Sequence, residues 1–117
     1  MQTASRWEPG PDDMLMSAFG HGEVRAAEEL FIRFAPAIFG LGLRTFEDPD
    51  VASDLVEDTF VRLWRRAGRF SSRSVSLESW IDAHAIGEAL RMILADVAAH
   101  ETAALVTRRT DDDRVRA

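Results

Sequence analysis

The sequence predicts an all-α fold, a compact bundle of about four helices. The first reason is that apolar residues recur at three- and four-residue spacing over most of the chain, which is the period of one face of an α-helix. The second is that no segment shows the strict alternation of a strand, and neither an internal repeat nor a heptad array stands out. The third is length, because 117 residues can build one hydrophobic core but not two.

The first two helices are delimited by glycine and proline. Residues 1–11 contain two prolines and a glycine and are expected to form a flexible N-terminal lead. A short helix should begin at Asp12 and end at the Gly-His-Gly sequence of residues 20–22. A long helix should follow from Glu23, with a kink or break at Pro36, because proline removes a backbone hydrogen bond. Its expected core positions are Ala27, Leu30, Phe31, Phe34, Ile38, Leu41 and Phe46.

The long helix contains two glycines near its end, Gly40 and Gly42. Their spacing is superficially similar to that of a glycine-rich nucleotide-binding loop. No strand precedes them, and Thr45 occupies the position where a third glycine would be needed. We therefore attribute them to close packing between two helices.

The central helix is expected to start at Asp48, whose side chain can cap it, with Pro49 in its first turn. Its packing side should consist of Val51, Ala52, Leu55, Val56, Phe60, Leu63 and Ala67. The opposite side carries carboxylates first and arginines later, an order that suits the helix dipole. The spacing of Asp58 and Arg62 also permits an ion pair. One side of this helix therefore packs, and the other offers a charged surface.

The last helix is expected after the Gly- and Ser-rich turn of residues 68–75, with Ser76 as its cap. We expect its buried stripe to consist of Trp80, Ala83, Gly87, Leu90, Leu94 and Val97. A second apolar set lies on the other side: Ile81, Ala85, Ala89 and Met92. Two interpretations of the second set stay open, an interface with a second copy of the chain or an alanine-rich surface. Residues 101–117 have alternating blocks of charge and are expected to be a charged C-terminal tail.

The composition indicates a cytoplasmic protein. Without cysteine the chain can form neither a disulfide nor a thiolate metal site. No segment approaches the apolar length of a membrane span, and the N-terminus lacks the order of a signal peptide. The 14 basic residues, all arginine, are outnumbered by 20 acidic residues, giving a net charge of -6. Because such a chain repels nucleic acid as a whole, any contact with DNA must be local.

The sequence offers no catalytic constellation. His21, His84 and His100 are dispersed and do not have the spacing of metal ligands. The serines of residues 71–79 lack the glycine-framed turn of a nucleophile. We therefore predict a protein that is not an enzyme and that uses no metal or cofactor.

One stretch of the chain carries a specific family resemblance. The sequence DLVEDTFVRLWRR at residues 54–66, followed by SLESWI at 76–81, resembles region 2 of bacterial sigma factors of the extracytoplasmic-function (ECF) group. The resemblance extends from about residue 12 to about residue 94, and it implies a region-2-like domain over residues 12–100. In that family this helix docks on the clamp coiled coil of RNA polymerase. The resemblance thus assigns polymerase binding to Asp54, Glu57, Asp58, Arg62 and Arg65.

The chain departs from the family in the helix that faces the promoter. Ile86 and Gly87 stand where arginine and asparagine are usual, so no polar side chain is available there to read a base edge. Residues 77–100 contain four acids and one base, a balance of 1 - 4 = -3 that opposes phosphate binding. Family members also carry region 4, a second promoter-reading domain, for which the 117 residues contain no sequence.

The turn between the last two helices keeps the candidates for DNA contact: Arg69, Phe70, Arg73 and Trp80. In the family this loop holds a flipped base, which stacking on an aromatic ring beside an arginine could stabilise by about 1 to 3 kcal/mol. The alternative is that Phe70 and Trp80 belong to the core and that the arginines only keep the loop soluble.

Two functions are compatible with these observations. The first is a transcription initiation protein that binds core RNA polymerase and helps to recognise or melt promoter DNA. The second is a sigma mimic or interaction module that binds polymerase, a sigma factor or an anti-sigma partner without reading DNA, and that forms a homodimer through its last helix. A dimer of that kind would cover the family's DNA face. The acidic last helix favours the second function, and both functions require the central signature.

Overall fold

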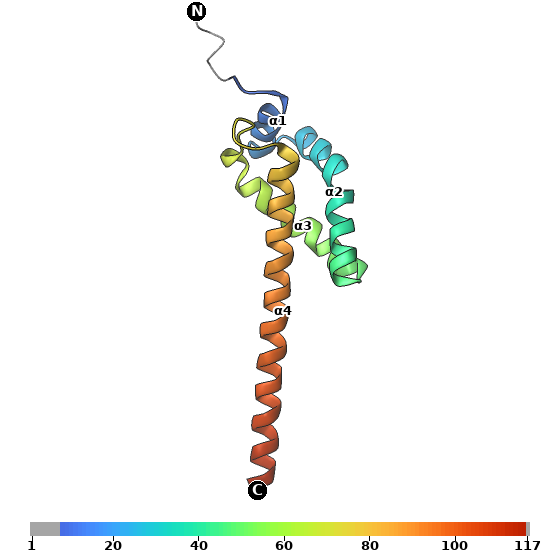
Figure 1. Ribbon diagram of the computed structural model, residues 1–117, viewed down its shortest axis with the longest axis vertical. Helices are drawn as coiled ribbons and strands as arrows, with labels where there is room; N and C mark the ends of the chain where they lie inside the picture. The colour runs from blue at the N-terminus through green and yellow to red at the C-terminus, as the bar shows by residue number, and fades with distance from the viewer. Residues whose placement is uncertain (1–7, 117) are drawn as a thin grey trace, which may run out of the picture.

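The computed structural model describes the backbone of residues 8–116 and the side chains of residues 8–110. Its elements are four α-helices and one 3-10 turn: α1 (Pro11–Gly20), α2 (Val24–Phe46), α3 (Pro49–Arg65), η2 (Ala67–Arg69) and α4 (Leu77–Arg116). This part of the chain contains no strand, so the predicted all-α fold of about four helices is confirmed. Figure 1 shows α1, α2 and α3 gathered around the first half of α4, whose second half projects beyond them.

The first two helices differ from the prediction at two points. α1 begins at Pro11, one residue earlier than expected, and the Gly10 amide donates a hydrogen bond of 2.8 Å to the Asp13 carboxylate in its first turn. α2 is one helix that runs through Pro36, so of the two predicted outcomes, a kink or a break, the break does not occur. Because Pro36 is exposed, water can satisfy the backbone carbonyl that the proline leaves without a donor. Residues 1–7 of the predicted N-terminal lead lie outside the described residues.

The start and the packing side of α3 agree with the prediction. The Asp48 carboxylate caps the helix by accepting a hydrogen bond of 2.8 Å from the amide of Asp50. The buried residues of α3 are Ala52, Leu55, Val56, Thr59 and Leu63. Leu55, Val56 and Leu63 join one core with residues of the other helices: Met16, Phe19, Leu30, Phe34, Ile38, Leu77 and Ile81.

α2 and α3 approach each other closely at Gly42. A Cβ atom built on Gly42 would lie 2.7 Å from the Cα of Ala52, a separation that real Cβ contacts do not show. A Cβ on Gly40 would meet only the far end of the flexible Arg44 side chain, at 3.3 Å. The interpretation of the glycines as a helix-packing feature is therefore confirmed for Gly42, and α2 can lie against α3 only because this residue has no side chain.

Of the predicted buried stripe of α4 only Trp80 packs against the core, where it is half-buried, and the rest of the prediction is wrong. Ala83, Gly87, Leu90, Leu94 and Val97 are exposed, whereas the second apolar set supplies the core. The side of α4 that packs contains Leu77, Ile81, Ala85, Glu88 and Ala89, with Met92 half-buried. The small side chains of Ala85 and Ala89 let the neighbouring helices come close. Glu88, on the same side, forms an ion pair with Arg62 of α3. Periodicity identified both apolar sides of α4 but did not indicate which one the bundle would cover.

α4 also continues through the segment for which we predicted a charged tail. Its backbone is helical as far as Arg116, and every described side chain from Ile93 to Thr110 is exposed. None of the described helices is long and apolar enough to cross a membrane.

The close approach at Gly42 gives a test of the packing. We expect Gly42→Ala to lower the free energy of unfolding by about 1 to 3 kcal/mol, because the new methyl group must push α2 away from α3. Gly40→Ala is the matched control and should be neutral, or stabilising by up to about 1 kcal/mol, because alanine favours the helix. Urea denaturation measures both variants, and equal effects would contradict the packing described here.

Candidate functional site

The five residues to which the resemblance assigns polymerase binding all lie on α3, but the structure divides them into two groups. Asp54, Glu57 and Arg65 are exposed, and their spacings of three and eleven residues place them on the outer side of the helix. Asp58 and Arg62 face α4 instead. The ion pair that their spacing permits is replaced by two pairs with α4, Arg62 Nη1 to Glu88 Oε2 at 3.2 Å and Arg91 Nη2 to Asp58 Oδ2 at 3.8 Å.

The Glu88 carboxylate is the centre of this contact. Its side chain retains only 4% of its exposure, and it accepts hydrogen bonds from Arg62 on α3 and from Arg91 on its own helix. The Arg91 Nε atom lies 2.9 Å from Glu88 Oε1. Because a buried carboxylate is stable only when it is paired, the two arginines fix the position at which α4 meets α3.

Sequence reasoning missed the role of Glu88 and counted it among the acids that repel DNA. The signal was present in the spacing, because Glu88 follows Ile81 by seven residues and therefore lies on the same side of α4. That side was assigned to the surface or to a second copy, so the burial of Glu88 was not foreseen.

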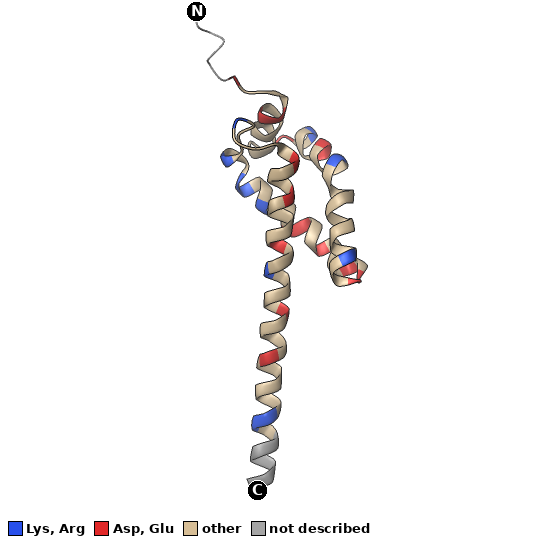
Figure 2. Ribbon diagram, viewed as in Figure 1, with Lys and Arg blue, Asp and Glu red and all other residues tan. Residues whose placement is uncertain are grey.

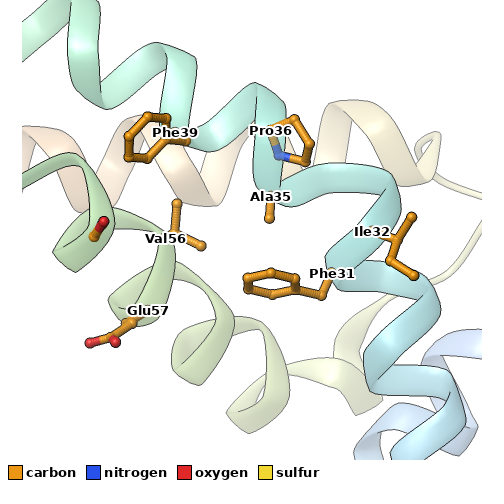
Figure 3. Close-up of a pocket in the computed structure, with 8 residues that line it drawn as sticks. Phe31, Ile32, Ala35, Pro36, Phe39, Val56 and Glu57 are labelled. Atoms are coloured by element: carbon orange, nitrogen blue, oxygen red, sulfur yellow. The ribbon is translucent and has the colours of Figure 1, made fainter. Parts of the chain in front are cut away.

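An apolar groove lies between α2 and α3, and Glu57 is the member of the exposed group that lines it. It has a volume of about 670 Å³ and is lined by Phe31, Ile32, Ala35, Pro36, Phe39, Ser53, Val56 and Glu57. Figure 3 shows Phe31, Ala35 and Phe39 of α2 facing Val56 of α3. Phe31, expected in the core, is 51% exposed, and its ring packs against Phe60 with 5.2 Å between centroids. α3 thus presents an acidic side chain, Glu57, at an open apolar surface.

The turn after α3 contains the candidates for DNA contact. Phe70 is buried in the core, and Trp80 is half-buried against it with ring centroids 5.5 Å apart. Trp80 also stacks near His84, at 4.3 Å between centroids. Arg69 and Arg73 are exposed. The structure therefore places the Phe70 ring as the alternative interpretation did, in the core, and leaves only the two arginines freely accessible.

Asp13 holds this turn against α1. Its carboxylate accepts hydrogen bonds from the hydroxyl and the amide of Ser72, the latter at 2.8 Å. The Ser72 hydroxyl, followed by the Ser72 amide, holds the pKa of Asp13 below its usual value. The geometry of the turn therefore depends on a charged Asp13.

The acidic residues of α4 repel DNA less strongly than their number in the sequence suggests, because two of the four are paired with arginines. Glu78 pairs with Arg33 of α2 at 2.6 Å, and the same arginine pairs with Asp12 of α1 at 3.2 Å. Glu88 is paired as described above, so only Asp82 and Asp96 among the four acids are exposed without an arginine partner in the described structure. Figure 2 shows that the arginines gather around the end of α3 and the turn that follows.

The site has the chemistry of a binding surface. Charged side chains around an exposed apolar area are typical of protein interfaces, in which an apolar centre is surrounded by a polar rim. In the part of the chain that the structure describes, no three His, Cys, Asp or Glu side chains gather closely enough to hold a metal ion. The fold and this surface define a small all-α domain with a face suited to a macromolecular partner.

Comparison with known proteins identifies the family of this domain. Residues 30–96 match the family described as Sigma-70 region 2, which covers more than half of the chain. The chain therefore belongs to the sigma-70 region 2 family, and its resemblance to region 2 of ECF sigma factors is confirmed.

Among curated proteins the chain is similar to the ECF RNA polymerase sigma factor SigK of Mycobacterium sp. (strain KMS) and to that of Mycobacterium sp. (strain JLS). Each is 25% identical over 69 residues, which are 59% of this chain and 36% of the relative. The chain thus matches only about a third of the length of these relatives. No solved structure matches it significantly.

The buried carboxylate gives a test of how α3 is joined to α4. We expect Glu88→Ala to lower the free energy of unfolding by about 1 to 3 kcal/mol, because Arg62 and Arg91 lose charge-assisted hydrogen bonds. Both arginines are partly exposed and can return to water, which keeps the loss below that of a fully buried pair. Glu101→Ala, on the exposed part of the same helix, should change stability by less than about 0.5 kcal/mol in the same urea titration. A Glu88→Ala protein as stable as this control would show that the buried pair is not formed.

The lowered pKa of Asp13 predicts how acid acts on the turn. The contribution of Asp13 is fully present above its unfolded pKa of about 3.9 and is lost as the pH falls through the lower folded pKa. Stability should therefore fall less steeply for Asp13→Asn than for wild type between about pH 4 and pH 2. Urea midpoints at several pH values measure this slope, with exposed Asp82→Asn as the control, and the Ser72 amide signal in NMR should titrate with Asp13. Identical slopes for wild type and Asp13→Asn would count against the contact.

Proposed function

We propose that this chain is a sigma-factor-like transcription protein that binds core RNA polymerase through the outer side of α3. The observation that carries the proposal is the surface within the matched region: Asp54, Glu57 and Arg65 are exposed on α3, and Glu57 also lines the apolar groove between α2 and α3. The relatives that match this region are themselves named as RNA polymerase sigma factors.

The apolar and the charged parts of this surface support different contributions to binding. The groove offers exposed apolar area at Phe31, Ile32 and Pro36, which a partner helix can cover with a gain from the hydrophobic effect. Glu57 lines this groove, and Asp54 and Arg65 are exposed on the same helix, where charges select a partner and orient it more than they add affinity. Asp58 and Arg62, which the resemblance assigns to the same contact, also pair with Arg91 and Glu88 of α4 and so help to keep α3 in position.

A second function is favoured by the structure of the turn and of α4. Phe70 is packed in the core, and Ile86 and Gly87 are exposed on α4 without a polar side-chain group. A protein that occupies polymerase or a sigma partner without reading promoter DNA accounts for both features. In either function the protein acts by binding and not by catalysis.

Binding of purified core RNA polymerase to labelled protein tests the first proposal. The informative variant is Asp54→Arg with Arg65→Glu, because both residues are exposed and neither takes part in the ion pairs of the described structure. We expect this exchange to weaken binding at least about tenfold, since charges of the wrong sign would then face the partner. Charge reversal at Arg62 is avoided because it would place a carboxylate next to the buried Glu88.

The matched control exchanges Arg25→Glu and Glu29→Arg, an exposed pair on α2 that leaves the net charge equally unchanged. The control should bind like wild type. Equal binding by all three proteins, or no binding by wild type, would refute the proposed contact. A fluorescent promoter fragment added to the bound complex then separates the two functions, because a melting factor changes its signal in a salt-dependent way and a mimic does not.

A further inference from the structure

Four arginine side chains line one polar cavity between α3 and α4. The cavity has a volume of about 400 Å³, and its basic members are Arg62, Arg65, Arg66 and Arg91. The first two lie in the last turn of α3, Arg66 caps the end of that helix, and Arg91 comes from α4. Figure 2 shows the arginines gathered around this end of α3. Because like charges at close range repel one another, such a cavity is suited to an anion.

The carboxylates of the cavity neutralise only part of this positive charge. Glu88 pairs with two of the arginines, and Asp58 lies 3.8 Å from Arg91. Four guanidinium groups against two carboxylates leave a formal excess of two positive charges. Among the described residues, neither Arg65 nor Arg66 has a partner in an ion pair or a side-chain hydrogen bond. The excess charge therefore belongs to these two side chains.

Glu88 holds the other two arginines in place for a ligand. A guanidinium group has five N–H donors. The hydrogen bonds to Glu88 use one nitrogen of Arg62 and two nitrogens of Arg91, which leaves further donors on both side chains. Because the Glu88 side chain keeps only 4% of its exposure, it fixes both arginines from the inner wall of the cavity. Donors that are already oriented bind an anion at a lower entropic cost.

We propose that this cavity binds the terminal phosphate of a small phosphorylated compound of the size of a nucleotide. The planar fork of a guanidinium group matches the oxygens of a phosphate, and charge-assisted hydrogen bonds of this kind are among the strong ones. A terminal phosphate carries nearly two negative charges at neutral pH, which matches the excess charge of the cavity. Arg65 and Arg66 supply the charge, and Arg62 and Arg91 supply oriented donors.

The charge and the size of the site favour a small compound over a nucleic acid. Each phosphate within a nucleic-acid backbone carries one negative charge and continues into a sugar on both sides, so it cannot place a doubly charged end in the cavity. A volume of about 400 Å³ lies within the range of small-molecule pockets. An extended polyanion also meets the other charges of a chain whose net charge is -6, whereas a small ligand interacts mainly with groups within about 8 Å.

Titration calorimetry with pyrophosphate at about 0.15 M ionic strength tests the proposal. Wild type should bind one equivalent with a dissociation constant below about 1 mM. Arg65→Gln with Arg66→Gln should weaken binding at least about tenfold, because both unpaired guanidinium groups are lost. Circular dichroism confirms that the variant folds. The titration contains no polymerase, so its result is independent of the proposed function.

The matched control is Arg25→Gln with Arg44→Gln, which removes two exposed arginines of α2 and therefore the same net charge. The control should bind pyrophosphate like wild type. In NMR spectra of wild type, the Nε–H signals of Arg65 and Arg66 should shift with pyrophosphate, and those of Arg25 and Arg44 should not. Absence of binding by wild type, or equal weakening in both double variants, would overturn the proposal.

Competition with a single-stranded DNA oligonucleotide distinguishes the two sources of phosphate. We expect pyrophosphate and a nucleoside triphosphate to shift the same Nε–H signals, and the oligonucleotide to leave pyrophosphate binding unchanged within about twofold at an equal concentration of phosphate groups. An oligonucleotide that shifts the signals of Arg65 and Arg66 and that pyrophosphate does not displace would overturn the proposal, because the arginines would then contact a nucleic-acid backbone.

Discussion

The ion pairs around Glu88 are the constraint from which most of the arrangement follows. The carboxylate is buried where α4 meets α3, and Arg62 and Arg91 hold it there. If α4 were rotated by half a turn, the stripe of Ile86, Leu90 and Val97 would enter the bundle, but Arg62 would lose its carboxylate. A buried ion pair adds little net stability, yet it penalises any arrangement that leaves one partner alone. The pair therefore fixes the rotation of α4, and with it the apolar side that the bundle leaves uncovered.

The same interaction shapes the candidate binding surface. Since Asp58 and Arg62 are directed towards α4, the outer side of α3 is left to Asp54, Glu57 and Arg65. The groove beside these residues has a separate cause. α2 and α3 are in contact at Gly42, and towards Phe31 the side chains leave an open apolar channel. A polar side and an apolar side of one surface are thus produced by two different packing contacts.

Sequence reasoning succeeded where the physical cause is local. The start of α3 depends on a carboxylate that caps the next amides and on a proline in the first turn, and both are visible within three residues of sequence. It also recovered the all-α fold and the charged side of α3 as a surface, because periodicity defines the sides of a helix. It failed where the outcome depends on a partner. Periodicity showed that α4 has two apolar sides, but only the three-dimensional position of Arg62 decides which is buried. The exposed ring of Phe31 and the network of Glu88 could not be foreseen for the same reason, since each depends on residues more than 20 positions away in the sequence.

The unbroken course of α4 has a mechanical consequence. The helix is 40 residues long, so it measures about 60 Å and contains no proline at which it could kink. Its first turns pack in the bundle through Leu77, Ile81 and Ala85. The loop that precedes it is held by the hydrogen bond from the Ser72 amide to the Asp13 carboxylate. The far end therefore cannot swing as a tether would. Whatever holds the outer side of α3 therefore also sets the direction in which the second half of α4 projects from the bundle (Figure 1).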